Sequence, residues 1–136
     1  MQVKEVMTTR VVSVAPNSNV KDAAALMNKH NIGSVPVVDS GMVRGIITDR
    51  DIVLRCVAEG RDANNLRVSD ICSSGAIAVK PVQSLSDAIH VMASEQVRRL
   101  PVVDDGKLVG MLSLADIARE KSGMELAGAI SDISMP

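Results

Sequence analysis

The sequence contains no phenylalanine, tyrosine or tryptophan among its 136 residues. Its core must therefore be built from Val, Ile, Leu, Met and Ala, and a flat base that binds has to lie between aliphatic side chains. Proteins that bind single-stranded nucleic acid commonly stack bases on aromatic rings, so this absence argues against that class. The formal charge of −1 gives no electrostatic basis for a nucleic-acid or anionic-membrane partner.

Cysteine and histidine are scarce as well. Cys56 and Cys72 form no C-x-x-C or Cys/His pattern, so neither a disulfide framework nor a zinc site is indicated. His30 and His90 have no Ser/His/Asp or Cys/His constellation around them. The P-loop, H-E-x-x-H and G-x-G-x-x-G motifs are also missing. We therefore expect a protein that is not an enzyme and that has no metal site.

No apolar run approaches the roughly twenty residues that cross a bilayer, and the polar start does not resemble a signal peptide. These features predict a cytoplasmic protein without a membrane partner. With 46% hydrophobic and 23% charged residues, the composition is typical of a folded globular protein. The length allows one domain or two small units that share a core.

An internal repeat organises the chain. Shifting the sequence by 65 positions aligns residues 3–52 with 68–117 without a gap, and a duplication explains this. We place the first repeat, with its lead-in and connector, at 1–66, the second at 67–122 and a tail at 123–136. Identical pairs include Val14/Val79, Pro16/Pro81, Pro36/Pro101, Asp39/Asp104, Gly45/Gly110 and Asp51/Asp116.

Each repeat is predicted to run strand, helix, strand, strand, helix. A unit of about fifty residues buries little core alone, so we expect an α/β (α+β) fold in which two β-α-β-β-α units pack about a pseudo-twofold axis. The tail carries a weak apolar stripe that suits either docking on a partner subunit or a frayed end. The predicted strands are 11–14, 34–38 and 43–47, then 76–79, 99–103 and 107–112; the predicted helices begin near Ser18 or Asn19, at Ser84, and at Asp49 and Leu114, the last two running to about Glu59 and Lys121.

Two hydroxyl-x-x-acid motifs stand where a predicted strand opens a helix. They are Thr48 with Asp51 and Ser113 with Asp116. In one interpretation they form a capping box that binds nothing, which is the commoner use of the pattern. In the other, the hydroxyl and the helix start receive a phosphate while the acid accepts from ribose hydroxyls. Pro101, inside a predicted strand, suits either an edge strand or a backbone that lines a base pocket.

These motifs together resemble a tandem pair of cystathionine-beta-synthase (CBS) domains, the Bateman module. The resemblance rests on the lead-in Val6-Met7-Thr8, on Val-Pro-Val-Val-Asp, and on Gly-Ile-Ile-Thr-Asp-Arg-Asp-Ile-Val with their second-repeat counterparts, and it covers residues 3 to about 120. It implies a regulatory module, of the stand-alone type, that binds AMP, ADP, ATP or S-adenosylmethionine in clefts between the two units. It also implies a homodimer and an unknown effector protein.

Carried across by this resemblance, the ligand-binding residues include the two hydroxyls and two acids. First-strand contacts are implied at Thr8 and Ser13 in the first repeat, and at Ser73 and Ala78 in the second. The basic pair that reaches phosphates in some members corresponds to Arg98 and Arg99, where the first repeat has Gly33 and Ser34. We predict that the cleft reached by this pair is the stronger phosphate site. The alternative is a solvated basic pair that binds nothing.

Two functions therefore remain. The first is a non-catalytic sensor whose adenosine ligand changes the shape or association of the module. The second is an interaction or dimerisation scaffold with empty clefts. A ligand that binds only the folded state raises the unfolding midpoint, so nucleotide-dependent thermal stability distinguishes the two.

Overall fold

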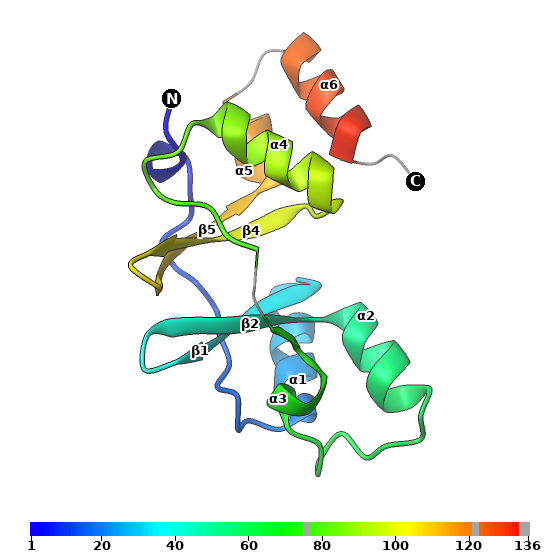
Figure 1. Ribbon diagram of the computed structural model, residues 1–136. Helices are drawn as coiled ribbons and strands as arrows, with labels where there is room; N and C mark the ends of the chain where they lie inside the picture. Colours follow the sequence, from blue (N-terminus) through cyan, green and yellow to red (C-terminus); the bar gives the residue numbers. More distant parts are fainter. Residues whose placement is uncertain (75–76, 121–122, 134–136) are drawn as a thin grey trace. The chain divides into compact units, whose positions relative to one another are not determined.

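The structure is a computed structural model that describes residues 1–74, 77–120 and 123–133, with the backbone alone for 123–126 and 129 (Figure 1). Contacts divide the chain into two compact units. We call Val12–Ala76 the Asp51 unit, and Met1–Val11 together with Ile77–Pro136 the Asp116 unit. Each repeat has a lead-in, which precedes residue 12 in the first repeat and residue 77 in the second, and a body that follows it. Each unit combines the body of one repeat with the lead-in of the other.

Backbone hydrogen bonds fix this exchange of lead-ins. The N–H of Val3 donates to the carbonyl of Gln83 at 2.8 Å, inside the Asp116 unit. The N–H of Val68 donates in the same way to the carbonyl of Ser18 at 2.8 Å, inside the Asp51 unit. Contacts therefore group the chain differently from the boundary that the repeat suggested after residue 66.

In the Asp51 unit a helix packs on a small antiparallel sheet. The sheet hairpin is β1 (Ser34–Asp39) with β2 (Met42–Thr48), in register from Ser34 opposite Thr48, and β3 (Ser73–Ser74) also pairs with β2. The apolar stripe of α1 (Val20–His30) supplies Val20, Ala23 and Met27 to the core. The other helical elements are α2 (Asp49–Ile52), which continues as a π-helix over Val53–Val57, and α3 (Val68–Ile71); α1 itself spans Val20–His30.

The Asp116 unit repeats this plan with an additional helix. Its hairpin is formed by β4 (Arg99–Asp104) and β5 (Lys107–Ser113), in register from Arg99 opposite Ser113. Val3, Leu85, Met92, Leu100 and Leu112 are among its buried core residues. The helical elements are the short 3-10 turn η1 (Val3–Glu5), α4 (Leu85–Glu95), α5 (Leu114–Ala118) and α6 (Gly123–Ile133).

Local signals in the sequence explain where these elements begin and end. Asn19 and Ser84 cap α1 and α4 by accepting from the N–H groups of Asp22 and Asp87 at 2.9 and 3.0 Å. The turns between the hairpin strands carry a positive φ at Ser40 and Gly41, and again at Asp105 and Gly106, as a two-residue hairpin turn requires. The mixed α/β fold class is thereby confirmed.

Two predicted strands are wrong. Residues 11–14 and 77–79 are not strands but single bridges, Val14 to Val37 and Val79 to Val102; Ala76 lies outside the described residues. The prolines of the neighbouring strands explain the short pairing, because Pro36 and Pro101 accept from Val14 and Val79 through their carbonyls but have no N–H to donate.

The tail is a helix that packs on its own unit. Figure 1 shows α6 beside α4, and α6 contacts both α4 and α5. The side chain of Ile133 is 3% exposed within the core of the Asp116 unit, and the amide of Gln96 donates to the carbonyl of Asp132 at 2.9 Å. The apolar stripe expected in the tail consists of Leu126, Ile130 and Ile133. Ile130 is exposed, and the side chain of Leu126 lies outside the described part. Within that part, no helix is long and apolar enough to cross a membrane.

Candidate functional site

The lead-ins reach the sheets through two glycines. A Cβ atom on Gly45 would lie 2.2 Å from the carbonyl oxygen of Ser73, and one on Gly110 would lie 3.0 Å from that of Thr8. Ser73 pairs with Ile46, and Thr8 exchanges backbone hydrogen bonds of 2.8 and 2.9 Å with Met111. The absence of a side chain at each glycine lets a lead-in cross the strand just before the helix that follows it.

This crossing places Thr8 and Ser73 in the opposite units from those expected, since each was expected to serve the site of its own repeat. Thr8 lies in the Asp116 unit, where its hydroxyl donates to Oδ1 of Asp116 at 3.5 Å. Ser73 lies in the Asp51 unit, on β3, where it pairs with Ile46. Ile46 lies two residues before Thr48. Thr8 therefore contacts the acid of the other repeat, and Ser73 lies on the strand pair that leads to the helix of Asp51.

We use the name Asp116 cluster for Thr8, Arg98, Arg99, Ser113 and Asp116. The N–H of Ser113 donates to Oδ2 of Asp116 at 2.9 Å, and the N–H of Asp116 donates to the hydroxyl of Ser113 at 3.1 Å. The carbonyl of Arg98 accepts from the N–H of Leu114 at 2.8 Å, and Arg99 pairs with Ser113 across the hairpin. The basic pair and the acid thus meet at one strand-to-helix junction.

Neither Arg98 nor Arg99 forms an ion pair with any residue that the structure describes. Arg98 is exposed and Arg99 is half-buried. Their guanidinium groups are consequently available to an anion, although the exposure of Arg98 reduces what a contact with it is worth.

We use the name Asp51 cluster for Thr48, Asp51 and Ser73. The N–H of Thr48 donates to Oδ2 of Asp51 at 2.9 Å, and the N–H of Asp51 donates to the hydroxyl of Thr48 at 3.1 Å. No described residue donates a hydrogen bond to Oδ1 of Asp51. This carboxylate therefore keeps one oxygen available on a half-buried side chain.

The surroundings of the Asp51 cluster carry charges of both signs, from Asp49 and Asp51 and from Arg50 and Arg55. Gly33 stands where the other repeat has Arg98, and a Cβ on Gly33 would lie 3.0 Å from Oδ2 of Asp49. Burial raises the pKa of the Cys72 thiol, and the negative charge of Asp51 raises that pKa further. The Asp51 cluster therefore has a second carboxylate beside it, that of Asp49, and no counterpart of the basic pair.

Both hydroxyl-x-x-acid motifs form capping boxes, so the predicted capping geometry is confirmed. Capping uses one oxygen of each carboxylate, Oδ2 in both cases. A carboxylate offers about four lone-pair sites, so a cap does not exhaust its capacity to accept. The cap and the ligand site are compatible at Asp51; at Asp116 the second oxygen already receives donors.

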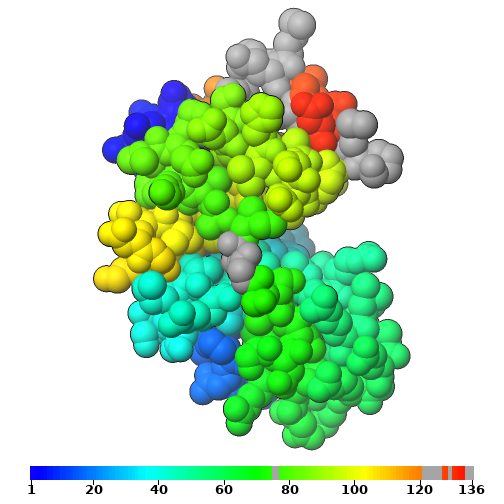
Figure 2. All heavy atoms as spheres, in the orientation of Figure 1, coloured from blue at the N-terminus to red at the C-terminus, as the bar shows by residue number. Residues whose placement is uncertain are grey.

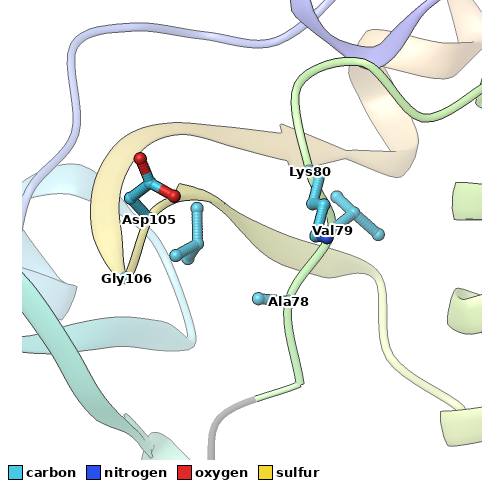
Figure 3. A pocket seen from close by; sticks show the side chains of 6 residues that line it. Ala78, Val79, Lys80, Asp105 and Gly106 are labelled. Carbon is cyan, nitrogen blue, oxygen red and sulfur yellow. The ribbon is translucent and has the colours of Figure 1, made fainter.

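Ser13 and Ala78 each line a cavity that neither acid lines. Ser13 lines a cavity of about 410 Å³ with Ser18, Asp22 and Lys29. Ala78 lines one of about 380 Å³, formed by the segment before α4 and by the turn at Asp105 and Gly106 (Figure 3). Neither Asp51 nor Asp116 lines these two cavities.

The carbonyl of Pro101 is used inside the protein. It accepts from the N–H of Val79 at 3.0 Å, so Pro101 holds the segment that carries Ala78 instead of offering that oxygen to a ligand. Sequence reasoning also missed Arg119, whose guanidinium forms an ion pair with Asp116. Its position three residues after Asp116 was the signal, because residues at i and i+3 share a helix face.

The fold and these paired junctions agree with one family. The family model for the CBS domain matches residues 3–57 and 68–123, and the chain belongs to this family as a pair of CBS domains. The chain is 46% identical over 133 residues to CBS domain-containing protein YhcV of Bacillus subtilis (strain 168), which covers 97% of this chain and 94% of that protein.

Two solved structures are similar. A crystal structure of Hypoxic Response Protein I with two coordinated zinc ions has a TM-score of 0.83 and 32% identity, covering 90% of this chain and 100% of that one. The CBS domain pair of protein MJ0100 in complex with 5-methylthioadenosine and S-adenosyl-L-methionine has a TM-score of 0.76 and 27% identity, covering 88% and 94%. In the described part of the present chain, no group of three or more His, Cys, Asp or Glu residues is placed to hold a metal ion.

Proposed function

We propose that this CBS domain pair is a non-catalytic sensor that binds an adenosine-containing ligand through the ribose at the Asp51 and Asp116 clusters. The ligand is AMP, ADP, ATP or S-adenosylmethionine, and it acts as a regulatory ligand. The observation that carries the proposal is that each unit places an acid, a helix-start hydroxyl and a lead-in Ser or Thr at one strand-to-helix junction. Binding of an adenosine derivative by the MJ0100 pair supports it.

The charges of the two clusters suggest different ligands. Arg98 and Arg99 favour a phosphate at the Asp116 cluster, and charge-assisted hydrogen bonds are worth about 1.5–3 kcal/mol each when desolvated and less at an exposed side chain such as Arg98. At the Asp51 cluster, Asp49 repels a phosphate, and the adjacent Arg50 offsets only part of that repulsion. We therefore propose that the Asp116 cluster takes phosphorylated ligands and that the Asp51 cluster takes neutral or cationic adenosine derivatives.

Calorimetric titration of the full chain with AMP, ATP, adenosine and S-adenosylmethionine tests this. Asp51→Asn and Asp116→Asn are the appropriate variants, because the asparagine oxygen still accepts the capping hydrogen bond while the charge and one acceptor are lost. We expect Asp116→Asn to weaken AMP and ATP, and Asp51→Asn to weaken S-adenosylmethionine. No binding of any of the four at millimolar concentration would end the proposal.

A scaffold function is the second candidate, and one surface favours it. The helical segment from Asp49 to Val57 lies at the molecular surface (Figure 2) and exposes Val53, Leu54 and Val57 by 55%, 47% and 67%. We propose that a second copy of the chain covers this apolar face in a homodimer, and that an effector protein reads the dimer. Sedimentation velocity of wild type and Val57→Asp measures this: the variant should be monomeric, and an unchanged dimer would exclude this face.

A further inference from the structure

Asp116 is the only charged residue that is buried in the described part of the chain, with 4% of its surface exposed. A buried carboxylate is costly unless donors compensate it. Its Oδ2 receives the N–H of Ser113, and its Oδ1 receives the hydroxyl of Thr8 and the guanidinium of Arg119. Both oxygens are therefore engaged by the protein itself.

Arg119 is the donor that can leave most easily. The N–H of Ser113 is fixed in the backbone, whereas the side chain of Arg119 is 66% exposed and follows the last residue of α5. An exposed arginine can turn its head group into water without losing core packing. A ribose hydroxyl that approaches Oδ1 of Asp116 needs the position that this guanidinium occupies.

The other repeat provides an internal comparison. Leu54 stands 65 residues before Arg119, is 47% exposed, and has no group that can donate to a carboxylate. The capping bonds of Asp51 and Asp116 have the same lengths, 2.9 and 3.1 Å in both units. The two acids therefore share one backbone frame and differ in whether a guanidinium covers the second oxygen.

We propose that Arg119 is a built-in competitor for the ligand at Asp116, and that Leu54 leaves Asp51 without one. This rests on the proposed function. Every ribose-bearing ligand must displace Arg119 from Asp116 before binding, which weakens all of them by the same factor. Only a ligand that gains from Arg98 and Arg99 then binds at low concentration, so the competitor excludes neutral nucleosides from this cluster.

The test is calorimetric titration of the full chain with adenosine and with AMP. The Asp51→Asn background confines the measurement to the Asp116 cluster, and Arg119→Leu copies the residue of the other repeat. We expect adenosine and AMP to bind about fivefold more tightly, or about 1 kcal/mol, with the ratio of their affinities unchanged. If Arg119 instead contacts the phosphate, Arg119→Leu will weaken AMP relative to adenosine, and the proposal is overturned.

The reciprocal variant serves as the matched control. Leu54→Arg, in the Asp116→Asn background, should weaken adenosine at Asp51 about fivefold by the same competition. Because Leu54 also lies on the face proposed for the homodimer, sedimentation velocity of this variant accompanies the titration. If Arg119→Leu does not fold, the Leu54→Arg variant still tests whether a guanidinium at this position competes with the ligand. If the wild type binds and both variants bind with unchanged affinities, the competitor proposal is overturned and the proposed function stands. If neither the wild type nor any variant binds, the proposed function is overturned as well.

Discussion

Gly45 is the residue at which the exchanged lead-in approaches the sheet most closely. A Cβ there would lie 2.2 Å from the carbonyl oxygen of Ser73, and carbon–oxygen contacts are normally no shorter than about 3.3 Å, so in Gly45→Ala this carbonyl has to move by about 1 Å. Gly45 has no positive φ, so the cost comes from the contact and not from the backbone conformation. β3 has only two residues, and it pairs with β2 at Gly45 and Ile46.

The displacement should remove this pairing. Overpacking costs about 1–3 kcal/mol and each lost backbone hydrogen bond about 1 kcal/mol, so we expect Gly45→Ala to lower the free energy of unfolding by about 3 kcal/mol. Gly110→Ala, at the equivalent position, should cost about 1 kcal/mol. Its nearest neighbour, at 2.7 Å, is the sulfur of Met7, a flexible side chain that can turn away, and the carbonyl of Thr8 lies farther off at 3.0 Å.

Thermal unfolding followed by circular dichroism measures the difference. For a chain of this length, 1 kcal/mol shifts the midpoint by about 3–5 °C, so the two variants should differ by about 8 °C. Gly128→Ala is the control, because its Cβ meets nothing within 4 Å in α6 and should raise stability by up to about 1 kcal/mol. Equal midpoints for Gly45→Ala and Gly110→Ala would refute the close approach of Ser73. Because Ser73 moves, Gly45→Ala should also weaken ligand at the Asp51 cluster only.

Three further outcomes are expected. Ile133→Ala should lower stability by about 2 kcal/mol in urea denaturation, since the side chain is buried in the Asp116 unit; a change within error would show that α6 is not docked. Asp51→Asn should lower the raised pKa of the Cys72 thiol by removing one of its two causes, so that iodoacetamide labels Cys72 faster at pH 8, as peptide mass spectrometry can measure beside Cys56; an equal rate would contradict the proximity of the charge. Asp116→Ala should unfold at a lower temperature than Asp116→Asn, because only asparagine retains the capping acceptor; identical midpoints would mean that the cap contributes nothing.

The elements that the sequence predicted correctly depend on local chemistry. The caps at Asn19 and Ser84 need one side chain and an N–H three residues later, and the hairpin turns need residues that tolerate a positive φ. The π-helix after α2 was not predicted. The residues of Val53–Val57 give no pattern that distinguishes hydrogen bonds between residues five apart, as in a π-helix, from those between residues four apart, as in an α-helix.

The exchange of lead-ins could not be predicted from periodicity. Val3 and Val68 occupy equivalent positions in two repeats with nearly the same apolar pattern, so each lead-in fits either core equally well by sequence. What decides between them is the length and path of the chain before each body, a nonlocal property. Gly45 and Gly110 were visible as paired glycines, but a glycine inside a strand also suits a bulge, so their meaning became clear only with Ser73 and Thr8 in place.

Three paired differences near the two acids share one direction of charge, whereas Arg50 and Arg55 of the Asp51 unit, which correspond to Ala115 and Glu120, differ in the opposite direction. At three paired positions the Asp51 unit carries Gly33, Asp49 and Leu54, where the Asp116 unit carries Arg98, Leu114 and Arg119. Each replacement adds a positive charge near Asp116 or removes a negative one. Capping alone gives no reason for this, because the capping bonds of the two acids have equal lengths. A pair of sites that select ligands of different charge does give a reason, since charge is the property that separates a nucleotide from a nucleoside or a sulfonium when both present the same ribose.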